Sequence, residues 1–144
     1  MRIRDILQTK GPEVVTVAPD RTVLDAMRLL VDRNIGSLLV LRDGRLLGIL
    51  TERDVLRLTS SRPDDFGSLP VSKVMTADVL TAGPLDDIHR VMDVMTQNRI
   101  RHLPILDDDG LAGLVSIGDV VNALRHSAQA ENEHLKQYIQ GQVY

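Results

Sequence analysis

The first half of the chain combines two hydrophobic periods, one typical of a helix and one typical of strands. Apolar residues in 23–31 recur at helical spacing and predict an amphipathic helix. The residues on its apolar face are Val23, Ala26, Met27, Leu30 and Val31. Short apolar stretches at 14–17, 37–42 and 45–50 predict strands, and Asp43-Gly44 predicts a hairpin turn between the last two. Leu38 to Leu41 is apolar at consecutive positions, so we expect that strand to be covered on both faces.

The second half of the chain repeats this pattern. Residues 14–56 align with residues 79–121 without a gap, and twelve of the 43 aligned pairs are identical. A unit of this size buries too little apolar surface to be stable alone. We therefore predict an α/β (α+β) fold in which two β-α-β-β-α repeats pack about a pseudo-two-fold axis. The predicted organisation is 1–60 for repeat one, 61–70 for a connector, 71–125 for repeat two and 126–144 for a helical tail.

Both repeats place a hydroxyl three residues before an aspartate where the last strand meets a helix: Thr51 before Asp54, and Ser116 before Asp119. One interpretation is a helix cap, although Asp is shorter than the Glu or Gln usual at this position, so its reach back to the cap is expected to be poor. The other is a nucleotide site, because a carboxylate accepts hydrogen bonds from the two hydroxyls of a ribose, and a helix N-terminus favours phosphate.

The doubled pattern, closing each time in Gly-x-x-Thr/Ser-x-x-Asp, resembles a tandem cystathionine-β-synthase (CBS) domain pair, the Bateman module, in its stand-alone bacterial type. The segments that carry the resemblance are Leu7-Gln-Thr-Lys-Gly11, Gly48 to Asp54, Arg101-His-Leu-Pro104 and Ser116-Ile-Gly-Asp119. The resemblance implies a non-catalytic module that binds AMP, ADP, ATP or NAD, and less readily S-adenosylmethionine, in clefts between the repeats. It also implies a homodimer.

The resemblance further implies which residues would touch the ligand. Those expected at the ribose are Thr51, Asp54, Ser116 and Asp119. Those expected at phosphates are Arg101, His102, Arg53 and Lys10. Those expected beside the adenine are Val14, Val15, Ile35, Val79, Leu80 and Ile100. Arg101 and His102 of the second repeat align with the uncharged Gly36 and Ser37 of the first. We therefore expect the two clefts to differ in positive charge. The Asp54 cleft would prefer phosphate-rich ligands, and the Asp119 cleft would hold adenosine with fewer charged contacts or stay empty.

Composition narrows the classes of function. The chain has no cysteine, which excludes disulfides, thiolate metal sites and cysteine nucleophiles. Three aromatic residues and a net charge of −3 argue against a nucleic-acid surface. The four histidines show no ligand spacing, so no metal site is expected. Neither a signal peptide nor a membrane-spanning apolar stretch is recognised, so we expect a cytoplasmic protein without a membrane partner.

Two other classes of function stay open. A ligand-free structural dimerisation or adaptor protein would need no doubled Thr/Ser-x-x-Asp, whereas a nucleotide-hydrolysing enzyme would need a base and a metal that the sequence does not supply. The tail carries Leu135, Tyr138 and Ile139 on one side. That edge is interpreted as intramolecular packing, as a dimer contact or as a docking helix for an unknown effector protein.

Overall fold

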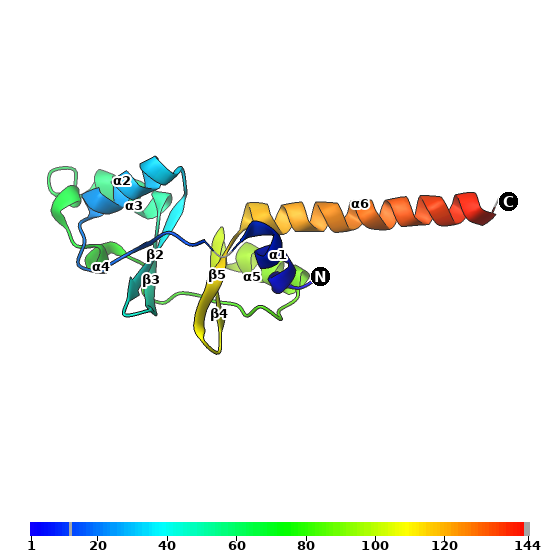
Figure 1. The fold of residues 1–144 in the computed structure, drawn as a ribbon. Helices are drawn as coiled ribbons and strands as arrows, with labels where there is room; N and C mark the ends of the chain where they lie inside the picture. The colour runs from blue at the N-terminus through cyan, green and yellow to red at the C-terminus, as the bar shows by residue number, and fades with distance from the viewer. Residues whose placement is uncertain (12, 143–144) are drawn as a thin grey trace.

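The computed structural model describes residues 1–11 and 13–142, and residues 143–144 of the predicted tail lie outside this range. The chain forms two lobes with their strands at the centre and helices on the outer sides (Figure 1). The lobe formed by the first repeat contains β1 (Thr16–Val17), α2 (Val23–Arg33), β2 (Ser37–Arg42), β3 (Arg45–Thr51) and α3 (Glu52–Ser61). The lobe formed by the second contains α5 (Ile88–Asn98), β4 (His102–Asp107), β5 (Gly110–Ser116) and the start of α6 (Ile117–Gln142). A 3-10 turn (Phe66–Ser68) lies in the connector.

The first sheet has the order β1-β2-β3, with β1 parallel and β3 antiparallel to β2. The hairpin forms as predicted, because Asp43 and Gly44 both adopt the positive φ that this tight turn requires (52° and 75°). The consecutive apolar residues of β2 are covered on both faces, since Leu38, Leu39 and Val40 are completely buried. The predicted α/β arrangement of two similar repeats is confirmed.

The second sheet contains only β4 and β5, and the strand predicted at 79–82 is reduced to one parallel bridge between Ala82 and Ile105. Proline explains the difference. In the first repeat the Leu39 amide donates to the Val15 carbonyl at 3.4 Å. The residue aligned with Leu39 is Pro104, which has no N–H to donate, so the parallel pairing cannot extend toward the chain start.

Two short helices pack on the lobe formed by the other repeat. Helix α1 (Ile3–Lys10) buries Ile3 and Ile6 in the core of the second lobe, and α4 (Val71–Val74) buries Val71 in the core of the first. After each helix the chain crosses to the opposite lobe (Figure 1). The repeats are therefore locked together by an exchange of their first helices.

The helical faces agree with the predicted pattern except at one position. Val23, Ala26 and Leu30 of α2 are buried, as are Ile88, Val91 and Met95 of α5. Apart from Val23, these residues belong to the two hydrophobic cores. The prediction was wrong for Val31, which is 78% exposed. It lies at the edge of the apolar stripe of α2, where no element packs on it.

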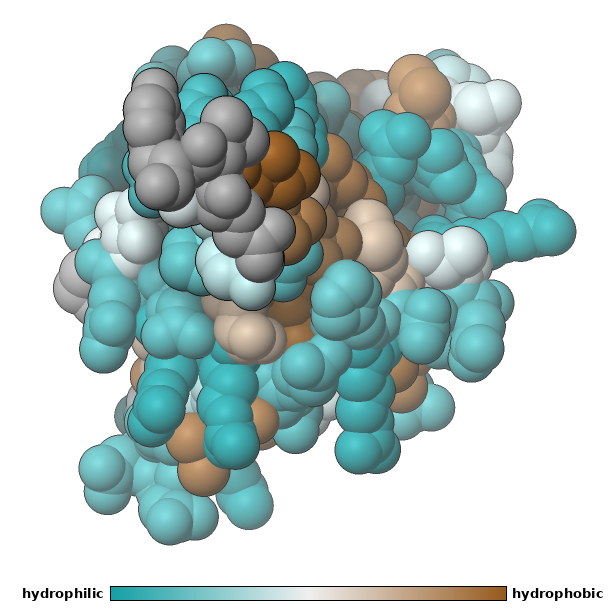
Figure 2. Space-filling model, turned by 90° about the vertical axis from the view of Figure 1, so that its right-hand side faces the viewer, coloured by the Kyte–Doolittle hydropathy of each residue, from teal (hydrophilic) through white to brown (hydrophobic). Residues whose placement is uncertain are grey.

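Helix α6 continues well beyond the second lobe (Figure 1). Its distal part exposes Leu135, Tyr138 and Ile139 by 58%, 62% and 60%. Figure 2 views the molecule from the side toward which α6 projects, where an apolar band crosses a largely polar surface. The tail is thus not packed inside its own chain. Among the helices of residues 1–11 and 13–142, none has the length and apolar character needed to cross a membrane.

Candidate functional site

The two Thr/Ser-x-x-Asp segments form matching helix caps at the starts of α3 and α6. The Asp54 amide donates to Thr51 Oγ1 at 3.2 Å, and Asp54 Oδ2 accepts from the Thr51 amide at 2.9 Å. Ser116 and Asp119 repeat this reciprocal pair at 3.1 and 2.8 Å. The expectation that aspartate would reach back poorly was wrong, since the extended backbone of the cap residue brings its amide close enough.

The cap occupies only one oxygen of each aspartate. Both reciprocal bonds use Oδ2, and within the described residues no hydrogen bond is formed to Oδ1 of Asp54 or Asp119. Both residues are half-buried at the junction of a strand and a helix. A carboxylate has about four acceptor positions. The cap interpretation is therefore correct, and it leaves acceptor capacity for a ligand.

The pattern alone is less specific than it looks in the sequence. Thr22-Val-Leu-Asp25 has the same spacing at the start of α2, where Thr22 caps the helix and accepts from the Asp25 amide at 3.2 Å. The Asp25 carboxylate pairs with Arg21 at 3.3 Å, and hydrogen bonding to Thr22 also lowers its pKa. The two junction aspartates differ from Asp25 in their position, because each lies directly after the last strand of a repeat.

Asp119 forms an ion pair with Lys10 of the same chain. Lys10 Nζ lies 2.6 Å from Asp119 Oδ2 and also donates to the Leu114 carbonyl at 2.9 Å. Burial raises the pKa of Asp119, but the hydrogen bonds and charge from Lys10, with donors at Ser116, outweigh this and hold the pKa below its ordinary value. Asp119 is therefore firmly ionised at neutral pH.

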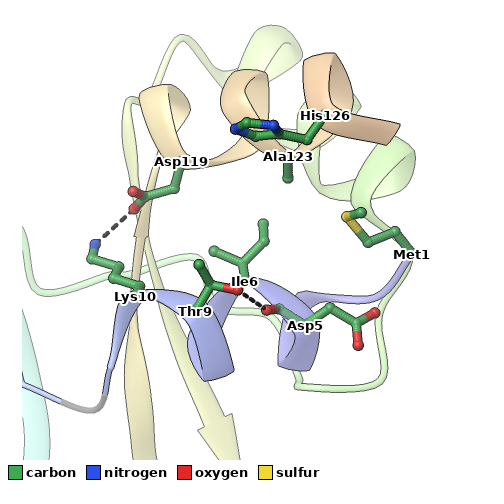
Figure 3. A pocket seen from close by; sticks show the side chains of 8 residues that line it. All are labelled: Met1, Asp5, Ile6, Thr9, Lys10, Asp119, Ala123 and His126. Atoms are coloured by element: carbon green, nitrogen blue, oxygen red, sulfur yellow. Dashed lines mark hydrogen bonds and ion pairs between the residues drawn. The ribbon is translucent and has the colours of Figure 1, made fainter. Parts of the chain in front are cut away.

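The Lys10–Asp119 pair closes one end of a hollow between α1 and α6 (Figure 3). The cavity measures about 520 Å³ and is large enough for a small organic ligand. Its lining residues are Met1, Asp5, Ile6, Thr9, Lys10, Asp119, Ala123 and His126. None of the apolar residues predicted to flank an adenine lines this cavity.

Three arginines line a second hollow of about 250 Å³. Arg53 comes from α3 of the first repeat, and Arg101 precedes β4 of the second. Arg99, which the sequence analysis missed, joins them at the end of α5 in a left-handed conformation with φ 54°. Ile100 also lines this hollow, whereas Asp54 does not. Guanidinium groups at one hollow form an arrangement suited to phosphate oxygens.

His102 lies between the lobes rather than at either hollow. A Cβ added to Gly36 would lie 3.5 Å from the His102 ring and 2.8 Å from Glu52 Oε1, so these side chains occupy the space that Gly36 leaves. Burial lowers the pKa of His102 below its ordinary value, and the positive charge of Lys10 acts in the same direction. The structure thus places Arg53 and Arg101 at one hollow and Lys10 at the other, while His102 lines neither.

The six apolar candidates are dispersed. Val15 and Ile35 pack on the core of the first lobe. Leu80 is 44% exposed, and Val14 and Val79 are half-buried. Ile100 packs on the core of the second lobe and is the one member that also reaches a described hollow. In the described part of the chain, no group of three His, Cys, Asp or Glu side chains is placed to hold a metal ion.

The comparisons with known proteins agree with this architecture. The CBS domain family model matches residues 3–61 and 71–126. The CBS domain-containing protein CBSX3 of Arabidopsis thaliana, a mitochondrial protein, is 38% identical over 96% of this chain and 72% of its own length. YhcV of Bacillus subtilis is 35% identical over 80% of this chain and 81% of its own.

Solved structures give the same result. The CBS-domain containing protein ATU1752 from Agrobacterium tumefaciens superposes with a TM-score of 0.83 at 37% identity, covering 85% of this chain and 98% of its own. The CBS domain pair of protein MJ0100, solved with 5′-methylthioadenosine and S-adenosyl-L-methionine, has a TM-score of 0.76 at 23% identity and covers 86% of this chain and 99% of its own. The two reciprocally capped repeats, with their exchanged first helices, are two CBS domains, and the chain belongs to the CBS domain family.

Proposed function

We propose that this chain is a non-catalytic regulatory module that binds adenosine-containing ligands, AMP, ADP, ATP or NAD, at Asp54 and Asp119. The observation that carries the proposal is the free Oδ1 of both capped aspartates at equivalent junctions. A ribose diol presents two hydroxyl donors to such a carboxylate. The related MJ0100 pair, which shares the fold, holds two adenosine compounds.

The arginine hollow supports phosphate recognition beside Asp54. Arg53 follows Glu52 at the start of α3 and immediately precedes Asp54, so a ligand on that carboxylate would place its phosphates near Arg53, Arg99 and Arg101. Asp119 has a neutral glycine, Gly118, at the position of Arg53. The two clefts are therefore proposed to differ, with the phosphate-rich ligand at Asp54.

Ligand binding would act through the contact between lobes. Each helix exchange ties one lobe to the other, so a ligand that touches both repeats stabilises one relative arrangement and shifts conformation or association toward it. A cytoplasmic homodimer, which presents this change to an effector protein, completes the proposal.

Thermal melts with AMP, ADP, ATP, NAD and S-adenosylmethionine test the function. A ligand at 100 times its Kd adds about 2.7 kcal/mol, which raises Tm by about 5–10 °C in a domain of this size. Asn variants are preferable to Ala, because an amide oxygen still accepts the cap hydrogen bond while the negative charge is lost. Asp54→Asn and Asp119→Asn should each reduce the ligand-induced shift.

Asp25→Asn is the matched control. It changes an aspartate of the same spacing on α2, away from both hollows, and should leave the ligand-induced shift unchanged. If none of the five compounds raises Tm, the sensing function is refuted.

The alternative function is a ligand-free structural dimerisation or adaptor protein. The exposed Leu135, Tyr138 and Ile139 of α6 favour it, because an uncovered apolar stripe on a projecting helix is typical of an association surface. Sedimentation with and without ligand separates the two. An adaptor keeps one association state in all conditions, whereas a sensor changes its state or its Tm when ligand is added.

A further inference from the structure

Lys10 binds one oxygen, Oδ2, of the carboxylate at which the second ligand is proposed to bind. Its ammonium donates to Asp119 Oδ2 and to the Leu114 carbonyl, at 2.6 and 2.9 Å. The side chains of Lys10 and Asp119 are 35% and 24% exposed, so the pair is partly shielded from water. Figure 3 shows Lys10 extending from α1 toward Asp119 on α6.

Within residues 1–11 and 13–142, no such cation pairs with Asp54 of the first lobe, whose exchanged helix α4 is shorter than α1. Helix α4 ends at Val74, and Thr76 then pairs with Ile49 of β3 through backbone hydrogen bonds of 2.9 and 3.0 Å. Ile49 aligns with Leu114, whose carbonyl accepts the Lys10 ammonium instead. A lysine side chain thus replaces a backbone bridge in one lobe only.

This replacement sets the electrostatic conditions for a ligand at Asp119. A ribose diol that engages both oxygens of the carboxylate would compete at Oδ2 with the charge-assisted hydrogen bond from Lys10, which is about twice as strong as a neutral one. A ligand that also carries phosphate offers the displaced ammonium a new anionic partner. Lysine suits this exchange, because its ammonium is a point charge on a flexible stem.

We propose that Lys10 is a specificity-determining residue, an internal competitor that makes the Asp119 cleft select phosphate-bearing adenosine ligands over adenosine itself. The inference rests on the proposed nucleotide-binding function and extends it. It also changes the expectation for this cleft, because the Asp119 site would disfavour a neutral nucleoside rather than accept it.

Calorimetric titration with adenosine and with AMP tests the inference in an Asp54→Asn background, where Asp119 is the remaining intact carboxylate. Lys10→Met should tighten adenosine binding about tenfold and leave AMP binding unchanged or weaker. The preference for AMP over adenosine should therefore fall at least tenfold. Lys10→Gln, which keeps an N–H donor for Leu114, should reproduce this fall if Lys10→Met disturbs α1. Lys10→Arg should keep the preference.

Lys73→Met is the matched control, because Lys73 is an exposed lysine on the other exchanged helix and lines neither hollow. Its AMP preference should equal that of the background protein. If AMP binds and its preference is unchanged in both Lys10→Met and Lys10→Gln, the role of Lys10 is refuted and the proposed function stands. If neither AMP nor adenosine binds any variant or the unmodified chain, both proposals are refuted.

Discussion

Gly48 and Gly113 occupy equivalent positions in the two repeats, yet the structure predicts different responses to an added methyl group. A Cβ on Gly48 would lie 2.7 Å from the Thr76 carbonyl oxygen and 2.6 Å from Met75 Sδ. A Cβ on Gly113 would lie 2.7 Å from Leu7 Cδ2, the end of a flexible side chain. A leucine methyl can rotate away, whereas a hydrogen-bonded backbone carbonyl cannot.

Gly48→Ala should therefore push the segment after α4 away from β3. Overpacking of this kind costs about 1–3 kcal/mol. The two backbone hydrogen bonds between Ile49 and Thr76 contribute about 1 kcal/mol each, so their weakening brings the expected loss of unfolding free energy to about 2–4 kcal/mol. Gly113→Ala should change stability by less than about 1 kcal/mol, because alanine is favoured over glycine within a strand by a similar amount.

Urea denaturation of both variants, with thermal melts as a second measurement, provides the comparison. At about 3 °C per kcal/mol, Gly48→Ala should lower Tm by about 6–12 °C and Gly113→Ala by no more than about 3 °C. Equal losses, or a larger loss for Gly113→Ala, would refute the conclusion that the helix exchange packs backbone against β3 in the first lobe only.

Three other outcomes are expected. Burial lowers the pKa of His102, so the unfolded chain binds a proton at this residue more readily than the folded chain, and stability should decrease as pH falls below about 6.5. The urea midpoint of His102→Gln should depend less steeply on pH in this range. The pKa of Asp119 is lowered despite burial, so the stability it contributes should be lost as pH falls below about 3.9, and Lys10→Met should reduce this loss in acid melts. Leu30→Ala should cost about 2–4 kcal/mol in urea denaturation, whereas the adjacent Val31→Ala should stay within about 0.5 kcal/mol.

Much of the local structure follows directly from the sequence. The aligned repeats predict the order of helices and strands, Asp43-Gly44 predicts the hairpin, and the buried run of β2 is visible in Leu38 to Leu41. The junction aspartates are found by their spacing together with its repetition at aligned positions of the two repeats. These features depend on neighbouring residues and on the spacing of apolar residues, and both can be read from a continuous stretch of sequence.

Only the tertiary structure determines which segments distant in the sequence contact each other. Helices α1 and α4 carry similar short apolar faces, and the two lobes offer similar grooves, so the pattern cannot indicate that each helix packs on the lobe of the other repeat. That exchange brings Lys10 to Asp119 and leaves Asp54 without an equivalent cation within the described residues. Arg99 joins Arg53 only because the lobes face each other. Hydrophobic periodicity indicates which side of one segment is buried. Contacts between distant segments depend instead on the length of the connections and on how the surfaces fit, and no single stretch of sequence contains this information.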